Sequence, residues 1–213
     1  MESPRPVDAA SSSAVDLLET RDIRTRFGVG SERIYRYQNS DVVVLSFGVV
    51  NGGPTPVRIH STCFTAHYLG SVECDCREQL EMTMAHMGAA QAGVIVFLDQ
   101  DGRGNGQVAL MRSSVLSTSE GLSVGDAYEQ LGYPRDARDF RAAGLVLRNL
   151  GLTEVLLWTN NPAKVAALVS AGLNVAINET SVSETDGPWL VDYYRKKATE
   201  GHMFERFGEG SQL

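Results

Sequence analysis

Apolar residues in this chain gather in short runs whose spacing changes between the periods of strands and helices. Residues 41–50, DVVVLSFGVV, are rich in β-branched side chains and predict a strand, and residues 57–60 predict another after the turn at 51–54. Residues 94–98 form a continuous apolar run, which is typical of a strand buried on both faces. The first half of the chain therefore contributes strands to a buried sheet.

Helical spacing separates these strands and recurs further along. Leu80, Met84 and Met87 repeat at the helical period within residues 77–90, and core packing is the simplest account of the two methionines. Residues 139–150 predict another helix, which Gly151 closes.

The second half reads as a strand–helix–strand unit. Residues 155–158 predict a strand that leads into a helix with Asn161 at its N-cap and Pro162 at its first position. That helix runs to about residue 171, and residues 173–177 predict the return strand. The alternation favours an α/β fold, with a mixed α+β fold as the alternative.

Composition and charge narrow the function classes. The chain has 213 residues, 43% of them hydrophobic and 21% charged, as in ordinary globular proteins that bury a core. A net charge of −7 argues against non-specific nucleic-acid binding, although a local cluster of Arg and Lys could still bind a small anion. No apolar run approaches the ~20 residues that span a bilayer. We therefore expect no membrane or nucleic-acid partner.

The two ends of the chain carry weaker patterns. The N-terminal stretch is polar, rich in Ser and Pro, and unlike a signal peptide, so residues 1–15 predict a disordered lead and the protein is expected to be cytoplasmic. Residues 191–198 could form a helix, to which the sequence assigns no role, and residues 201–213 are expected to be a flexible tail.

Three cysteines, Cys63, Cys74 and Cys76, lie close together in the sequence and are the only ones in the chain. Buried free thiols, or one disulfide with a spare thiol, are the plain alternatives. In a reducing compartment the clustering favours zinc, held by three thiolates with a fourth position open for water or substrate. If His60 or His67 closed that position, the zinc would be structural.

Two segments suit phosphate binding. The loop at 100–106 offers unobstructed backbone N–H groups and the guanidinium of Arg103, although glycine-rich turns after strands are common. Asp101 in this loop could help hold Mg²⁺ or read a base edge. The predicted helix that begins near Pro162 presents an N-terminus that attracts anions, with Lys164 in its first turn; an exposed lysine is the alternative.

Asp136, Arg138 and Asp139 precede the predicted helix at 139–150. In one interpretation Asp136 caps this helix, with Asp139 at its third position. In the other, a neighbouring carboxylate fixes Arg138 and points it at a phosphate.

The ordered set of motifs resembles the GTP cyclohydrolase II family over residues 42–178. The motifs are Arg58-Ile59-His60-Ser61-Thr62-Cys63, Gly70-Ser71, Cys74-Asp75-Cys76, Gln100-Asp101-Gly102-Arg103, Leu131-Gly132, Asp136-Ala137-Arg138-Asp139-Phe140 and Thr159-Asn160-Asn161-Pro162-Ala163-Lys164. The resemblance implies one compact catalytic domain over residues 16–200, with a mixed sheet flanked by helices, and a homodimer.

The resemblance also implies a reaction. GTP would lose C8 of its guanine as formate and its outer phosphates as pyrophosphate, giving 2,5-diamino-6-(5-phosphoribosylamino)pyrimidin-4(3H)-one. The three cysteines would hold one Zn²⁺, and Mg²⁺ would accompany the triphosphate. Asp136 matches the family's proton acceptor and Arg138 its proposed nucleophile, although a guanidinium that stays protonated suits charge stabilisation better. The matching GTP-contacting positions are Arg58, Ile59, His60, Ser61, Thr62, Gln79, Asp101, Gly102, Arg103, Ser123, Thr159 and Lys164.

The chain departs from the family pattern around these motifs. Thr62, His67 and Arg77 replace family residues, the first and last where the pocket is shaped, and Asp101 is shorter than the family glutamate. The tyrosine expected near the site is absent, because aligning from either side places Ser114 or Val115 there.

A phenol at that position could assist a late hydrolytic step. Our hypothesis is that formate is released poorly and a formamido product accumulates, in riboflavin synthesis or in a secondary pathway of the toxoflavin type. A non-catalytic nucleotide-binding descendant and a structural zinc module are the alternatives.

Overall fold

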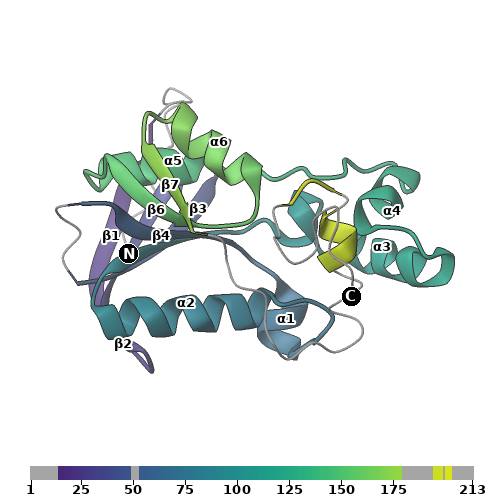
Figure 1. Cartoon of the computed structure of the whole chain (residues 1–213), viewed down its shortest axis with the longest axis horizontal. Coiled ribbons are helices and arrows are strands. Elements are labelled where there is room, and N and C mark those ends of the chain that lie inside the picture. Colours follow the sequence, from purple (N-terminus) through teal and green to yellow (C-terminus); the bar gives the residue numbers. More distant parts are fainter. Residues whose placement is uncertain (1–13, 49–52, 179–193, 199, 203–213) are drawn as a thin grey trace, which may run out of the picture.

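The five predicted strands join two that the sequence did not predict, β1 and β2, in one mixed seven-stranded sheet with the order β1-β2-β3-β5-β4-β6-β7 (Figure 1). The structure is a computed structural model and describes residues 14–48, 53–178, 194–198 and 200–202. The strands are β1 Asp16–Thr25, β2 Gly28–Tyr37, β3 Ser40–Phe47, β4 Thr55–Ser61, β5 Gly93–Leu98, β6 Glu154–Trp158 and β7 Asn174–Asn178. Strands β1, β2, β3 and β5 pair antiparallel, whereas β5, β4, β6 and β7 run parallel.

Helices cover both faces of the sheet. Helix α2, Cys76–Ala90, packs on one face, and α5, Arg141–Asn149, and α6, Pro162–Ser170, pack on the other (Figure 1). The remaining helices lie beside the sheet: α1 Phe64–Leu69, the 3₁₀ turn η1 Asp101–Gly104, α3 Gln107–Glu120 and α4 Val124–Gln130.

The central strands are apolar on both sides because each side meets a helical layer. In β3, Val42 and Val44 belong to the cluster that includes α5 and α6, whereas Leu45 and Phe47 pack with Met87 of α2. This arrangement confirms the core assignment of Met87, and of Met84 and Leu80 at its margin.

The α/β class and the predicted strands and helices of the sheet are confirmed, with ends within a few residues of those expected. Asn161 caps α6 by accepting from the N–H of Ala163 at 2.9 Å, and Pro162 is its first residue, as predicted. The proposed cap at Asp136 is wrong, since α5 begins only at Arg141 and its N-cap residue is Phe140.

Both chain ends extend beyond the described residues. Residues 1–13 of the predicted lead and 203–213 of the predicted tail lie outside them, while residues 194–198 are helical as expected. No helix in the described ranges is long and apolar enough to cross a membrane.

The parallel strands fix the place of the chemistry. Strands β4, β5 and β6 end at the same edge of the sheet, because their carboxyl ends point the same way. Ligands of open α/β sheets bind beyond such carboxyl ends. The motif at 60–63, the loop after Leu98 and the segment 159–161 therefore meet at one edge.

Candidate functional site

Three cysteine sulfurs converge beyond the end of β4. Cys63 directly precedes α1, Cys76 is the first residue of α2, and Cys74 lies in the turn between the two helices. The three Sγ atoms lie within 4.8 Å of one another, and those of Cys63 and Cys74 are 3.8 Å apart. The short α1 lets the chain fold back, so thiols separated in sequence meet in space.

This cluster has the dimensions of a thiolate zinc site. Zinc binds thiolate sulfur at about 2.3 Å in tetrahedral geometry, which separates two sulfurs by about 3.8 Å. Thiols this close also oppose one another's ionisation. Their mutual hydrogen bonds lower the pKa of Cys63, whereas the bond to Cys63 raises the pKa of Cys74 and raises that of Cys76 to about 12. A divalent cation would relieve that conflict, because a metal-coordinating thiol is deprotonated.

Neither candidate histidine joins the sulfur cluster among the described residues. The backbone N–H of Cys63 donates to Nδ1 of His67 at 3.3 Å, and Nε2 of His67 lies 3.0 Å from Nε2 of His60. Since Nδ1 of His67 accepts, its Nε2 carries the proton and donates to His60. The two rings therefore engage one another rather than the sulfur cluster.

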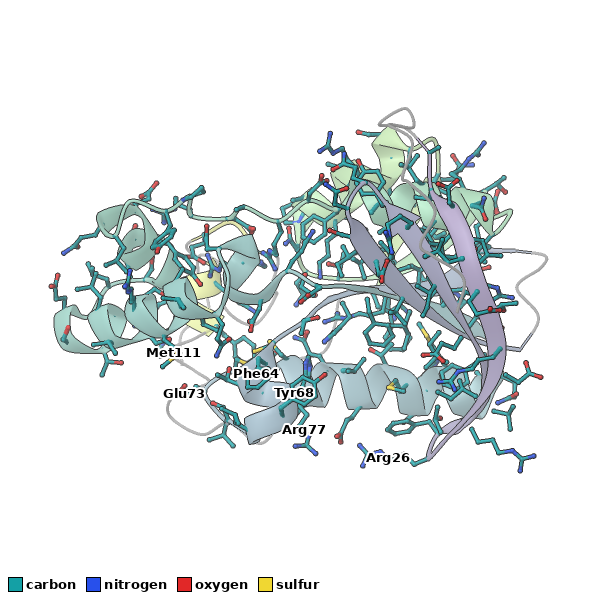
Figure 2. The ribbon with its side chains drawn as sticks, turned by 180° about the vertical axis from the view of Figure 1, so that it is seen from behind. Arg26, Phe64, Tyr68, Glu73, Arg77 and Met111 are labelled. Carbon is teal, nitrogen blue, oxygen red and sulfur yellow. The ribbon has the colours of Figure 1, made fainter. Side chains whose placement is uncertain are left out.

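A cavity of about 420 Å³ opens in front of the thiols. Its size falls within the range of small-molecule binding sites. The walls come from the ends of β4, β5 and β6, from η1, α3 and α4, and from Lys197 and His202 near the C-terminus. Figure 2 shows Glu73 and Met111, two of its lining residues, gathered at one side with Phe64.

Buried cations line part of the cavity wall. Arg58 is 5% exposed, donates from Nη1 to the carbonyl of Trp158 at 3.1 Å, and donates from Nη2 to Oε1 of Gln79. Lys164 is 7% exposed and donates from Nζ to the carbonyl of Ile59 at 2.8 Å. The lysine predicted in the first turn of α6 is therefore buried, so the alternative of an exposed lysine is wrong.

Burial lowers the pKa of both cations, and repulsion from neighbouring cations adds to the effect at Lys164. Desolvation lowers the pKa of Lys164 well below its usual range, and the charges of Arg58 and Arg138 lower it further. Desolvation also lowers the pKa of Arg58. A wall that bears several incompletely neutralised cations favours a bound anion, because the anion restores the charged forms.

Arg138 is held by Asp136, as the second interpretation predicts. Its Nε donates to Oδ1 of Asp136 at 2.8 Å and its Nη2 to Oδ2 at 2.5 Å. The hydrogen bonds and charge of Arg138 lower the pKa of Asp136 despite the opposing effect of burial. The guanidinium also lies 5.4 Å from the centre of the Phe140 ring, which Lys164 approaches at 5.5 Å.

The glycine-rich loop folds into η1 with two consecutive left-handed residues, Gly102 at φ 59° and Arg103 at φ 56°. A Cβ on Gly102 would meet the Tyr128 hydroxyl at 3.2 Å, so glycine allows this close approach. Both carboxylate oxygens of Asp101 accept backbone N–H groups, from Gly102 at 2.8 Å and from Phe64 at 3.2 Å. Asp101 thus organises the loop.

Most of the predicted substrate-contacting residues line the cavity. They are Arg58, His60, Ser61, Thr62, Gln79, Asp101, Gly102, Arg103, Thr159 and Lys164, together with Arg138 and the three cysteines. Ile59, Ser123 and Asp136 are not in its lining. Ile59 contributes its carbonyl to Lys164, while the Ser123 hydroxyl caps α4 by accepting from the N–H of Asp126 at 3.1 Å.

The departures from the family pattern fall in different places. Ser114 and Val115 line the cavity, so the wall formed by α3 carries no tyrosine at either position. Arg77 was expected to shape the pocket and does not line it. Instead its Nε pairs with Glu81 at 3.1 Å, and Arg26 joins Glu81 at 2.5 Å on the outer side of α2 (Figure 2).

Sequence reasoning missed several lining residues: Tyr128 of α4, Asn160, Asn161, Lys197 and His202. Desolvation raises the pKa of Tyr128, whose ring is fully buried and whose hydroxyl has no hydrogen-bond partner among the described residues. Asn160 and Asn161 belong to the motif at 159–164, so the sequence could have predicted their place at the site. Tyr128 and Lys197 gave none.

The chain is similar to known proteins over most of its length. The family model for GTP cyclohydrolase II matches residues 17–180. GTP cyclohydrolase-2 of Saccharophagus degradans is 36% identical over 200 residues, which cover 92% of this chain and 99% of the relative. GTP cyclohydrolase-2 of Xylella fastidiosa is 44% identical over 120 residues, 56% of this chain and 30% of the relative. The riboflavin biosynthesis protein RibBA of Synechocystis is 32% identical over 226 residues, 91% of this chain and 40% of the relative.

The fold and the site define an α/β protein in which a cluster of three thiols, able to hold a metal ion, faces a cavity lined by cationic side chains. The chain belongs to the GTP cyclohydrolase II family, a family of hydrolytic enzymes. It spans nearly the full length of the Saccharophagus relative and less than half of the Xylella and Synechocystis relatives.

Proposed function

We propose that this protein is a zinc-dependent hydrolase that opens the imidazole ring of GTP at C8 and releases pyrophosphate from the other end of the substrate. One observation carries the proposal: a single nucleotide-sized cavity joins the three-thiol cluster to a wall of buried cations. The relatives, GTP cyclohydrolase-2 and a riboflavin biosynthesis protein, support GTP as the substrate and riboflavin synthesis as the pathway.

Zinc held by Cys63, Cys74 and Cys76 would supply a water activated near neutral pH. The protein residues supply the rest. Arg58, Lys164 and Arg138 would bind the phosphates, and burial strengthens that attraction because water screens it poorly there. Two hydrogen bonds to Asp136 fix the direction of the Arg138 guanidinium, so this arginine would stabilise charge that develops at the α-phosphate.

The test is product analysis with GTP and Mg²⁺, with and without a chelator that strips zinc. We expect stoichiometric pyrophosphate and an opened pyrimidine product from the zinc-loaded protein, and loss of ring opening after chelation. Absence of turnover of any nucleotide by zinc-loaded protein would refute the proposal and favour a non-catalytic descendant.

We further propose a cytoplasmic homodimer with Mg²⁺ on the triphosphate. Sedimentation of the purified protein tests the dimer.

The fate of the C8 carbon defines a second candidate, in which the reaction stops at the formamido product. The absence of a tyrosine at Ser114 and Val115, both in the cavity wall, favours it. The buried phenol of Tyr128 opposes it, because this hydroxyl lies at the same cavity and could serve instead. Mass spectrometry separates the two outcomes, since retained formyl adds a fixed mass to the product.

A further inference from the structure

The helical turn at 194–198 folds back onto the site from the far end of the sequence (Figure 1). Tyr194 is fully buried, and its hydroxyl donates to Oδ2 of Asp75 at 2.8 Å. Asp75 stands between the metal-ligand candidates Cys74 and Cys76, and it is 2% exposed. The C-terminal segment is thus bonded directly to the loop that carries two of the three thiols.

A buried carboxylate is costly unless donors surround it. Asp75 has two donors at one oxygen, because Nε2 of Gln79 also donates to Oδ2. Nζ of Lys197 lies 3.9 Å from the other oxygen, close enough for an ion pair. Two of these three compensating groups come from residues 194–198, so the segment makes a buried acid at this position tolerable.

The contact continues from Asp75 into the substrate wall. Gln79 uses its amide nitrogen on Asp75, and its amide oxygen therefore faces Arg58 and accepts from Nη2. Arg58 in turn donates to the carbonyl at the end of β6. A hydrogen-bonded chain thus runs from Tyr194 through Asp75 and Gln79 to Arg58.

The same segment also holds the glycine-rich loop. Oε2 of Glu200 accepts from Nη2 of Arg103 at 2.6 Å, with side chains 7% and 16% exposed. Oε1 of Glu200 accepts from the N–H of Gly125 at 3.0 Å, at the start of α4. Arg103 has a left-handed backbone with φ 56°, a conformation that persists where surrounding contacts such as this ion pair hold it.

We propose that residues 194–198 and Glu200, to which the sequence assigned no role, are a working part of the active site. Tyr194 is a positioning residue for the Cys74–Cys76 loop and, through Gln79, for Arg58. Glu200 is a positioning residue for Arg103. The inference rests on the proposed function in taking the three thiolates to hold zinc.

Tyr194→Phe tests the first contact, because it removes the hydroxyl and keeps the ring. Partners that orient metal ligands typically contribute 10- to 100-fold to metal affinity or activity. We expect zinc to transfer to a competing chromophoric chelator about 10-fold faster, and the KM for GTP to rise, with the melting temperature nearly unchanged. Tyr35→Phe is the matched control, since Tyr35 is 1% exposed in the core and outside the cavity lining.

Glu200→Gln tests the second contact and should give a different signature. It weakens the hold on Arg103 and leaves Asp75 untouched, so we expect a higher KM with an unchanged rate of zinc release. A double-mutant cycle with Asp75→Ala completes the design. Tyr194→Phe should add almost nothing in that background, because its acceptor is gone.

Equal rates of zinc release from wild type and Tyr194→Phe would overturn the inference, as would an equal acceleration by Tyr35→Phe. These outcomes are distinct from failure of the proposed function, in which the wild-type protein itself would bind no zinc. Zinc release needs no turnover, so the inference is judged independently of the products formed from GTP.

Discussion

Lys164 shows how one residue can serve an anion site at a cost to stability. Its ammonium is buried among other cations, and its pKa lies well below the usual 10.5. The unfolded chain therefore binds more protons than the folded one between the lowered pKa and 10.5, so the free energy of unfolding rises with pH across that window. Destabilised charges of this kind cluster at functional sites.

Lys164→Met should remove this pH dependence and weaken anion binding. The variant keeps the length of the side chain and lacks its charge, so we expect the ligand-free protein to be at least as stable as wild type at neutral pH. Pyrophosphate affinity should fall about 10-fold or more, since a charged hydrogen-bonding group is lost. Calorimetry in buffers of different ionisation enthalpy, at a pH within that window, would detect more proton uptake on pyrophosphate binding by wild type than by the variant. Equal uptake by both proteins would contradict this account.

Tyr128 offers a second prediction at the residue scale. A buried hydroxyl without a partner costs about 1–3 kcal/mol, so Tyr128→Phe should not destabilise the ligand-free protein. With GTP, we expect the variant to turn over more slowly and to shift its products from formate toward the formamido compound. Tyr133→Phe is the control, because that ring packs edge-on against Tyr128 at 6.4 Å and does not line the cavity. Identical formate yields from Tyr128→Phe and wild type would exclude a catalytic phenol.

At the scale of elements, the loop at 100–106 depends on glycine for two separate reasons. Gly102 has φ 59°, and a Cβ there would also lie 3.2 Å from both Leu110 and the Tyr128 hydroxyl. Gly106 has φ 87° and nothing within 4 Å of its Cβ position. Gly106 therefore offers backbone strain without crowding, whereas Gly102 combines crowding with the milder left-handed helical conformation, φ 59° and ψ 37°.

Gly106→Ala should cost about 1–3 kcal/mol of stability from backbone strain alone, because φ 87° with ψ 167° is a conformation that only glycine adopts readily. Gly102→Ala should in addition weaken GTP binding, since its Cβ would crowd Leu110 and Tyr128 and displace the loop that carries Arg103. Chemical denaturation measures the stability of both variants, and the KM for GTP measures binding. An unchanged KM in Gly102→Ala would show that the close approach of Tyr128 does not position this loop.

The sequence predicted the elements whose apolar pattern reflects burial on both faces, and it missed those that are largely exposed. Strand β1 is exposed at most positions, and its sequence DLLETRDIRT contains few apolar residues. Helix α3 is rich in serine and exposes Val108, Met111 and Val115. Helix α1 has 6 residues and α4 has 7, too few to establish a helical period.

The site divides in the same way. Local motifs predicted the thiols, Arg138 with its carboxylate, and the capped helix that carries Lys164. Contacts between distant segments could not be predicted from the sequence pattern, because pairs such as Tyr194 with Asp75 or Glu200 with Arg103 lie far apart in the chain and share no local periodicity. Residue type suggested pocket-shaping for Arg77, yet Glu81 one turn along the same helix holds it on the outer side.

At the scale of the whole molecule, the sheet brings two chemistries to one edge. The carboxyl ends of β4, β5 and β6 place the thiol cluster and the cationic wall around one cavity, and the C-terminal segment closes against both. This arrangement suits a long substrate that is attacked at its base and at its phosphates. Loss of ring opening at the thiol cluster should therefore leave pyrophosphate release at the cationic wall partly intact.

The most direct test follows the C8 carbon of GTP labelled with ¹³C at that position, in wild-type protein and in Cys74→Ser side by side. The account predicts that the zinc-loaded wild type moves the label out of the guanine ring, and that Cys74→Ser, which lacks one metal ligand, leaves it there while pyrophosphate release persists in part. Ring opening by Cys74→Ser at the wild-type rate, or a label that stays in GTP with zinc-loaded wild type, would contradict it.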